Sequence, residues 1–361
     1  MSLSVQRVRY PSFEHHHMNP EEVPVAQLAI ETDFTPMPEF RIGNDESWLV
    51  QWEPYDDSEG RLEIIEADVS LSPPPFIVRS RLGWFIKPDP MHQFSRKLIP
   101  PTVSILILSL FVHAIEPGLV DWGVISESFA GSYSFGPLEY PKLLFFAFPL
   151  FLIPLIIRTI ANFRDFARQK SLIDSPPPDP ILNINSNRQR FSVTLPDSVG
   201  DGISPIKARV QVGITVPERE VILRALNRRH MGQPSPGMST ALPEKRIASG
   251  DESGTGVGES TPMALSNTRS TILEPMRIME YGPWAHIDRL AESNKIDLEI
   301  PMWPGTVYSA LIAIHWELYV IFQRPDGSEI CWVQPVTVDQ TDEPITIEEA
   351  PVRSGRAELS G

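Results

Sequence analysis

Residues 143–157 read LLFFAFPLFLIPLII, an uninterrupted apolar run that leads directly into Arg158. A second run, residues 98–115, reads LIPPTVSILILSLFVHAI and contains no charged side chain. A buried helix of a soluble protein keeps a polar face toward water, and the run at residues 143–157 leaves no such face. The helix that contains residues 143–157 reaches span length over residues 142–163 when its flanking basic side chains extend to the membrane interfaces. The sequence therefore predicts two transmembrane helices, 98–115 and 142–163, that form a helical hairpin.

Basic residues flank this hairpin on both sides but are almost absent from the loop at residues 116–141. The flanks carry Arg79, Arg81, Lys87, Arg96, Lys97, Arg158, Arg164, Arg168 and Lys170. Because cytoplasmic flanks are rich in Lys and Arg, we expect an integral, multi-pass membrane protein with both termini cytoplasmic. The loop is rich in aromatic residues, which favours a belt at the membrane interface, and a re-entrant loop is the alternative.

Composition narrows the classes of partner. The chain has 361 residues, with 31 Lys and Arg against 46 Asp and Glu, a net charge of −15. A nucleic-acid binder normally carries a strong positive patch, so we expect no nucleic acid and take the lipid bilayer as one partner. The single cysteine, Cys331, excludes an intramolecular disulfide framework and any Cys-rich metal site.

The region before the hairpin divides into three segments. Residues 1–22 are polar and irregular, and we expect a flexible tail there. Residues 23–75 contain short β-rich runs between turn residues, which predict a β-rich cytoplasmic region. Residues 76–97 form a basic stalk that leads to the membrane. About fifty residues make a thin core, so strands from the C-terminal region are candidates to complete this sheet.

The region after the hairpin is expected to be mostly β. Residues 164–180 include the run DSPPPDP and predict a Pro-rich linker. Residues 181–338 predict a β-sandwich, interrupted at 231–271 by a segment of Gly, Pro, Ser and Thr that we expect to be disordered. The acidic tail, residues 339–361, is expected to be mobile.

The strongest β signal lies between Thr306 and Val338. Alternation places one set of apolar side chains on a single face of a long strand: Ile312, Ile314, Trp316, Leu318, Val320 and Phe322. A two-residue turn at Asp326-Gly327 would put Phe322 opposite Cys331. Cys331 is then a buried small hydrophobe and not a nucleophile.

Two groups of polar residues are candidates for interaction. His315 and Glu317 share the other face of the long strand and could hold a metal or polar ligand, although alternation favours a solvated face. Arg224, Arg228 and Arg229 lie toward the end of a short helix that begins at Pro217. Their charges complement the helix dipole, and a membrane-surface or partner contact is the alternative.

A family resemblance rests on LEIPMWPG at residues 298–305, Ser309, and IAIHWELYV at residues 312–320. This combination resembles arrestin-like β-sandwich domains, in which a Pro-rich stretch precedes a long strand. FSVTLP (191–196) and PIKARVQVGITVP (205–217) look like opening strands of the same sandwich. The resemblance implies an arrestin- or immunoglobulin-like β-sandwich and a role in protein binding and scaffolding.

These observations predict a membrane-anchored adaptor or scaffold that binds a cytoplasmic or membrane protein through its β-sandwich. The alternative is an accessory or pore-lining subunit of a membrane transport complex, for which Ser104, Ser109 and His113 supply polar groups in the first span. A membrane enzyme is not expected, since the chain has no HExxH, GxSxG or intact P-loop. We therefore assign no catalytic, cofactor-binding or metal-binding residue, and leave the partner and oligomeric state open.

Overall fold

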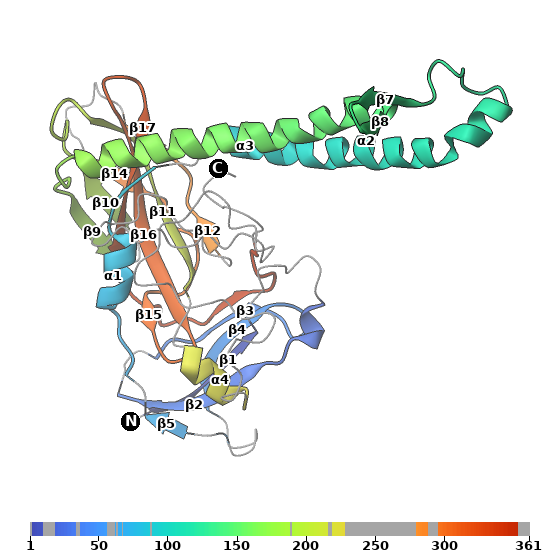
Figure 1. Cartoon of the computed structure of the whole chain (residues 1–361). Coiled ribbons are helices and arrows are strands. Elements are labelled where there is room, and N and C mark those ends of the chain that lie inside the picture. Colours follow the sequence, from blue (N-terminus) through green and yellow to red (C-terminus); the bar gives the residue numbers. More distant parts are fainter. Residues whose placement is uncertain are drawn as a thin grey trace. The chain divides into compact units, whose positions relative to one another are not determined.

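The computed structural model places most of the chain in two compact units (Figure 1). The described residues are 2–9, 19–33, 37–55, 62, 64–66, 68–86, 89–187, 190–215, 219–227, 279–287 and 295–352. The segment expected to be disordered, 231–271, lies outside them. The larger unit combines Met1–Lys87 with Leu172–Gly361, and the smaller unit is Pro88–Ser171.

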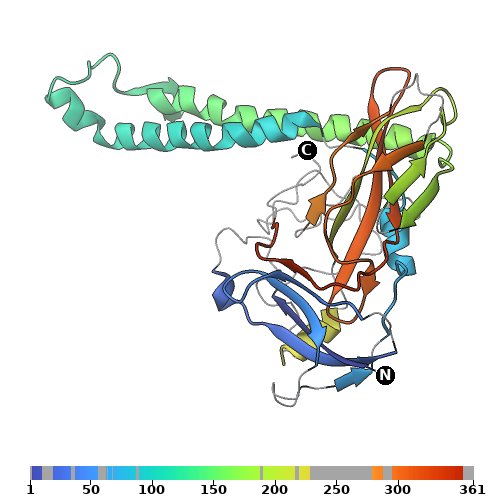
Figure 2. The same ribbon diagram turned by 180° about the vertical axis from the view of Figure 1, so that it is seen from behind.

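The smaller unit is built from two long helices, α2 (Pro90–Asp121) and α3 (Lys142–Asp174), which run side by side in both views (Figures 1 and 2). The hydroxyl of Ser95, early in α2, donates to the carbonyl oxygen of Pro154 in α3 at 2.7 Å. Both helices are long and apolar enough to cross a membrane, and they contain the predicted spans.

The ends of the hairpin differ in detail from the prediction. α3 continues to Asp174, so the first part of the expected linker 164–180 is helical. In the loop, β7 (Ser132–Phe135) and β8 (Leu138–Pro141) form a two-stranded antiparallel sheet. The loop therefore has regular structure of its own.

The first sheet of the larger unit has six strands in the order β18-β3-β4-β1-β2-β5. Its strands are β1 (Ser2–Arg9), β2 (Ala26–Thr32), β3 (Phe40–Gly43), β4 (Leu49–Pro54), β5 (Ile64–Glu66) and β18 (Ile345–Ile347). β18 comes from the far end of the chain and pairs in parallel with β3. The C-terminal region thus completes the N-terminal sheet.

Two segments expected to be irregular are part of this sheet. The prediction of a polar tail over 1–22 is wrong for β1, which pairs on both sides, with β2 and β4. Its polar residues Ser4 and Gln6 are buried, and Ser309 donates a hydrogen bond to Gln6 at 2.9 Å. The tail 339–361 was likewise expected to be mobile, but Ile345 in β18 is buried.

The second sheet has seven strands, in the order β12-β11-β16-β17-β6, with β13 beside β11 and β15 beside β16. The strands are β6 (Gly83–Phe85), β11 (Ser204–Ile214), β12 (Met279–Tyr281), β13 (Ala285–His286), β15 (Val307–Tyr308), β16 (Ala313–Gln323) and β17 (Glu329–Val336). The helix α1 (Pro75–Arg81) immediately precedes β6. The predicted basic stalk, 76–97, is therefore wrong, because most of it is α1, β6 and the first turns of α2.

A third sheet and two short helices complete the larger unit. The sheet has the order β14-β10-β9, from β9 (Asn183–Asn187), β10 (Arg190–Thr194) and β14 (Lys295–Leu298). The helices are η2 (Pro20–Glu22) and α4 (Arg219–Ala225). Trp52, Val193 and Trp316, one from each sheet, belong to a single hydrophobic core. Segments before and after the hairpin thus build one core.

The turn between β16 and β17 differs from the predicted two-residue loop. The Arg324 N–H donates to the Ser328 carbonyl, and the Gly327 N–H donates to the Arg324 carbonyl, both at 2.9 Å. Gly327 has a φ of 82°, which suits a three-residue loop ending in a left-handed residue. The register is therefore shifted by one, so that Phe322 lies opposite Ile330, while Cys331 lies opposite Ile321.

Both faces of β16 are buried. The predicted apolar face, Ile314 to Phe322 in alternation, lies in the main core, which confirms that part of the prediction. The opposite face was expected to be solvated, and this expectation is wrong. Tyr319 and Ile321 form a second apolar cluster there, together with Cys331. Two further residues of this face, His315 and Glu317, lie at the centre of a polar network.

Candidate functional site

His315 and Glu317 were predicted to face solvent, and both side chains are completely buried. The structure covers them with α1, whose last residue is Arg81. The Arg81 Nε donates to Glu317 Oε1 at 2.5 Å, and its Nη2 donates to Oε2 at 2.8 Å. This two-pronged geometry is the strong form of an arginine–carboxylate pair. Glu317 is thus paired with a residue that lies 236 positions away in the sequence.

The network extends from this ion pair in two directions. Gln211 on β11 donates to Glu317 Oε2 at 2.8 Å, and His315 Nε2 lies 2.8 Å from Oε1. Because a carboxylate only accepts, the proton of a neutral His315 is on Nε2, and Nδ1 accepts from the Tyr308 hydroxyl at 2.5 Å. The result is a continuous chain from Tyr308 through His315 and Glu317 to Arg81.

The surroundings favour the charged form of Glu317. Burial alone would raise the pKa of Glu317, but Arg81 and then His315 hold that pKa well below its ordinary value. Burial, followed by the negative charge of Glu317, raises the pKa of Tyr308, so its hydroxyl stays protonated. The network is therefore a buried carboxylate held between cationic and neutral donors.

A hydrogen-bonded series Tyr–His–Glu could relay a proton, but the burial of these residues decides what the network does. Each member is buried, so a substrate in solution has no access to it in this conformation. Among the described residues, no three His, Cys, Asp or Glu side chains lie close enough together to hold a metal ion. The arrangement instead fixes α1 on the sheet, where Ile77 of α1 joins Tyr308 and Ala313 in a small apolar cluster.

A second buried cation lies on the same face of the sheet. Arg209 of β11 is nearly inaccessible, with its guanidinium carbon 4.2 Å from the ring centre of Tyr281 and 4.4 Å from that of Trp284. Lys207 lies over the same Trp284 ring at 4.5 Å. Lys207, Arg209 and Gln211 alternate along β11, and this alternation was the one sequence signal for a polar layer on this face.

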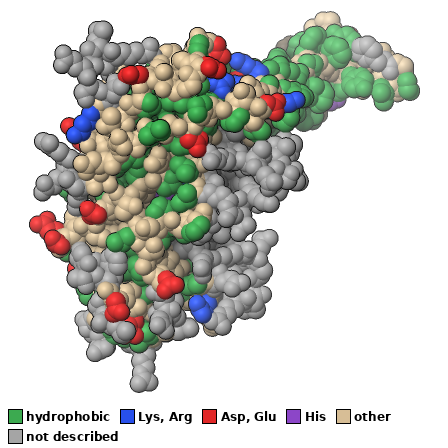
Figure 3. Space-filling model, turned by 90° about the vertical axis from the view of Figure 1, so that its left-hand side faces the viewer, with side chains coloured by type: hydrophobic (Ala, Val, Ile, Leu, Met, Phe, Trp, Pro, Cys, Tyr) green, Lys and Arg blue, Asp and Glu red, His purple; other side chains and the backbone are tan. Residues whose placement is uncertain are grey.

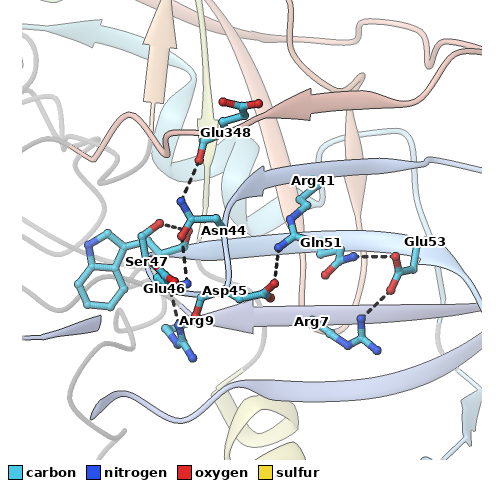
Figure 4. A network of polar contacts seen from close by, with 11 residues as sticks. Arg7, Arg9, Arg41, Asn44, Asp45, Glu46, Ser47, Gln51, Glu53 and Glu348 are labelled. Atoms are coloured by element: carbon cyan, nitrogen blue, oxygen red, sulfur yellow. Dashed lines mark hydrogen bonds and ion pairs between the residues drawn. The ribbon is translucent and has the colours of Figure 1, made fainter. Parts of the chain in front are cut away.

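The outer face of the six-stranded sheet carries a different, partly exposed set of charges (Figure 4). Arg7 donates to Glu53 at 2.6 Å, and Gln51 donates to the other oxygen of Glu53 at the same distance. Arg41 pairs with Asp45 at 2.9 Å. These pairs hold charged side chains of three strands in fixed positions on one surface.

The helical hairpin presents its apolar side chains outward. Of the most apolar 18 residues in α2 and in α3, only 6% and 11% are buried. The exposed large side chains include Ile105, Ile107, Leu108, Leu110, Phe111, Phe145, Phe146, Phe148, Leu150, Ile153, Leu155 and Ile156. Figure 3 shows hydrophobic side chains over most of the visible surface of the hairpin. A core helix of a soluble protein would be mostly buried, whereas these two helices expose a large apolar surface.

Charged residues bracket this apolar surface at a spacing close to the thickness of a bilayer. On α2 the bracket runs from Lys97 to Glu116, which at the rise of an α-helix is about 28 Å. On α3 it runs from Lys142 to Arg158, about 24 Å by the same rise. The hydrocarbon core of a bilayer is about 30 Å thick, so the spacing on α2 is close to one crossing and the spacing on α3 is shorter.

A polar cluster joins the helices at the end where α2 begins. Asp89 caps α2 by accepting from the Met91 N–H at 2.9 Å, and its own N–H donates to Asp165 of α3 at 3.0 Å. His92 Nε2 lies 2.9 Å from Asp165, and Arg168 also pairs with Asp165. These contacts fix the start of α2 against α3.

The remaining predicted candidates are only partly described. Arg224 is half-buried in the last turn of α4, next to β2 of the six-stranded sheet. Arg228 and Arg229 lie outside the described residues. Of the three described candidates, His315 and Glu317 belong to the buried network, whereas Arg224 lies on α4.

No family model, curated protein or solved structure matches this chain. The arrestin-like resemblance accordingly stays an expectation based on residues 191–217 and 298–320. The function must be argued from the hairpin and from the unit that the two flanks of the hairpin build together.

Proposed function

We propose that this chain is an integral membrane protein, anchored by the hairpin α2–α3, whose β-rich unit is a cytoplasmic adaptor that binds a protein partner. The observation that carries the anchoring is the exposed apolar surface of α2 and α3. The pairing of β6, which precedes the hairpin, with β17, which follows it, carries the topology. Gly83 pairs with Val333, and Phe85 pairs with Cys331.

This pairing restricts how the chain crosses a bilayer. Strands on opposite sides of a membrane cannot form one sheet, so segments that pair must end on the same side. The same restriction follows from β18. This strand comes after the hairpin and pairs with β3, which comes before the hairpin. An even number of crossings satisfies both pairings, and an antiparallel hairpin of two spans is the simplest case.

The charges favour the cytoplasmic side for the β-rich unit. Both flanks of the hairpin are basic, whereas the loop carries Glu116, Asp121, Glu127 and Glu139 with Lys142 at its edge. Lys142 is engaged locally, since its amine donates to the carbonyls of Ser128 and Ala130. The asymmetry therefore favours translocation of the loop.

Cysteine labelling tests the anchoring. In a Cys331→Ala background, we expect Ser126→Cys in the loop to react with an impermeant reagent in intact cells. Ser328→Cys, at the exposed turn between β16 and β17, is the matched control and should react only after permeabilisation. Equal protection of the two sites in intact cells, or release of the protein by alkaline carbonate, would contradict the anchoring.

For the adaptor role, the resemblance to arrestin-like domains implies protein binding. The outer face of the six-stranded sheet supports it with charges held in place by Glu53 and Asp45. A binding surface with fixed charges loses less side-chain freedom when a partner docks. Arg224 is a separate candidate position on α4, which packs beside β2 through Val221 and Ile222.

Purification of the tagged full chain from detergent extracts tests the adaptor role. We expect Arg41→Glu or Arg224→Glu to lose a partner that the wild type retains. Lys295→Glu, an exposed charge on β14, is the control and should keep it. If a chain reduced to the hairpin captured the same proteins, the β-rich unit would not be the adaptor.

One specific feature of α2 favours the alternative function, a subunit of a transport complex. His113 Nδ1 lies 2.9 Å from Glu116, whose carboxylate is buried at the far end of the helix. Ionisable groups in membrane helices often mark transport pathways. If this alternative holds, Glu116→Gln should change ion flux in reconstituted vesicles without changing insertion.

A further inference from the structure

The end of the hairpin where α2 begins and α3 ends carries charges of both signs, but they are distributed unequally. The basic residues are Arg96, Lys97, Arg158, Arg164, Arg168 and Lys170. Of the acidic residues, Asp89 and Asp165 are buried, and Asp174, the last residue of α3, is exposed. The charge presented outward at this end is therefore positive.

The buried acids also hold two of the arginines in place. Arg164 Nε lies 3.2 Å from Asp89, and the side chain of Arg164 is still 61% exposed. Arg168 pairs with Asp165 and is 40% exposed. Both side chains are thus paired with an acid while part of each stays accessible. An anion that binds there meets cations that are already ordered.

Apolar side chains lie among these cations. Phe94 on α2 and Phe163 and Phe166 on α3 are exposed, within a few residues of Arg96 and Arg164. Figure 3 shows Lys and Arg side chains close to where the hydrophobic surface of the hairpin begins. A free phosphate ion would satisfy the cations but leave the rings in water. A layer of lipid headgroups satisfies both, since phosphates meet the cations while rings enter the acyl boundary.

We infer that this end of the hairpin binds the anionic phospholipid headgroups of the cytoplasmic leaflet. The inference rests on the proposed insertion of the hairpin and names the lipid that the inserted protein selects. A cluster of four to eight Lys and Arg next to a span is the usual composition of such a site. The acidic loop at the opposite end has no comparable surplus of cations, so the selection is confined to one leaflet.

Spin-labelled lipids in vesicles that contain the full-length protein test this. The probes are spin-labelled phosphatidylglycerol and phosphatidylcholine, compared in a phosphatidylcholine background. We expect phosphatidylglycerol to be preferred about fivefold or more, since one Lys or Arg near an anionic surface already contributes a factor of about five. The preference should decrease as salt rises. The variant Arg96→Gln/Lys97→Gln/Arg164→Gln/Lys170→Gln should lose most of it, whereas Lys295→Gln should keep it.

The possible results distinguish failure of the lipid-binding inference from failure of the proposed membrane anchoring. A protein that inserts but restrains both labels equally overturns the inference and leaves the anchoring intact. A quadruple variant that keeps the preference overturns the assignment to these residues. If inorganic phosphate removes the preference while sodium chloride at equal ionic strength does not, the site is one for a free anion, and the inference is wrong. Failure of the wild type to insert contradicts the anchoring itself.

Discussion

Replacing Arg81 with methionine is the sharpest test of how α1 is held on the sheet. Methionine keeps a long apolar side chain but removes the guanidinium that meets both oxygens of Glu317. The carboxylate would then be left buried with only His315 and Gln211 as partners.

The expected magnitude follows from the burial of the pair. The side chains of Arg81 and Glu317 are only 4% and 0% exposed, so solvent does not screen the loss. Breaking a buried ion pair by removing one partner costs about 3–5 kcal/mol, because an uncompensated charge stays inside. Replacing both partners with apolar residues is often close to neutral. We therefore expect Arg81→Met and Glu317→Met each to cost about 3–5 kcal/mol, and the double variant to cost far less than their sum.

Chemical denaturation of the full chain in detergent measures these differences. Trp84, Trp316 and Trp332 are buried in the β-rich unit, so their fluorescence reports its unfolding. Arg41→Met, which removes an exposed ion pair, is the control and should cost less than about 1 kcal/mol. If Arg81→Met matched this control, or if the double variant were as damaged as the two single variants combined, the ion pair would not be what holds α1.

Three further outcomes are expected. Trp316→Ala should lower the free energy of unfolding by about 3–5 kcal/mol, measured in the same denaturation, because it leaves a cavity in the main core. Gly43→Ala should cost more than about 3 kcal/mol, since Gly43 has a φ of 87° and an added Cβ would lie 1.6 Å from the Trp48 carbonyl oxygen. The depressed pKa of Glu317 stabilises the fold above an unfolded pKa of about 4.3, and this stabilisation is lost as pH falls through the lower folded value. Denaturation between pH 7 and pH 3 should therefore show a steeper loss for the wild type than for Glu317→Gln.

The long strand β16 shows what the alternation of apolar and polar residues predicts correctly and what it does not. It placed Trp316 and Leu318 on the core face, which the structure confirms. It failed for Glu317, because alternation assumes that the other face of a strand meets water. That face is covered by α1, and the partner that neutralises Glu317 lies 236 positions earlier. Pairing over such a distance leaves no local pattern.

Composition was a reliable guide to the hairpin and a poor one to β1. An apolar run without a polar face admits few structures, so the two long helices could be predicted from residues 98–115 and 142–163. β1 contains Ser4 and Gln6 at buried positions, and it resembles a loop by composition. Its place in the sheet depends on partners such as Ser309, which no local pattern indicates.

The turn after β16 shows a third kind of error. Asp326-Gly327 suits a two-residue hairpin loop, and the same residues suit the longer loop in which Gly327 closes the turn. The two alternatives differ by one residue, and that residue decides which face Cys331 occupies. The structure places Cys331 beside Tyr319, whose hydroxyl donates to its sulfur at 3.0 Å.

The pairing of β6 with β17 also determines how late in synthesis the second sheet can be completed. Residue 85 leaves the ribosome long before residue 329, and chains grow at about 5–20 residues per second. β6 therefore waits roughly 12–50 s, while both helices are made, before β17 exists. Throughout that interval β3 lacks β18 and β6 lacks β17. Unpaired strand edges recruit other chains, so the nascent protein is vulnerable to aggregation during this interval. If the hairpin inserts as proposed, this vulnerable interval continues after the anchor is in place.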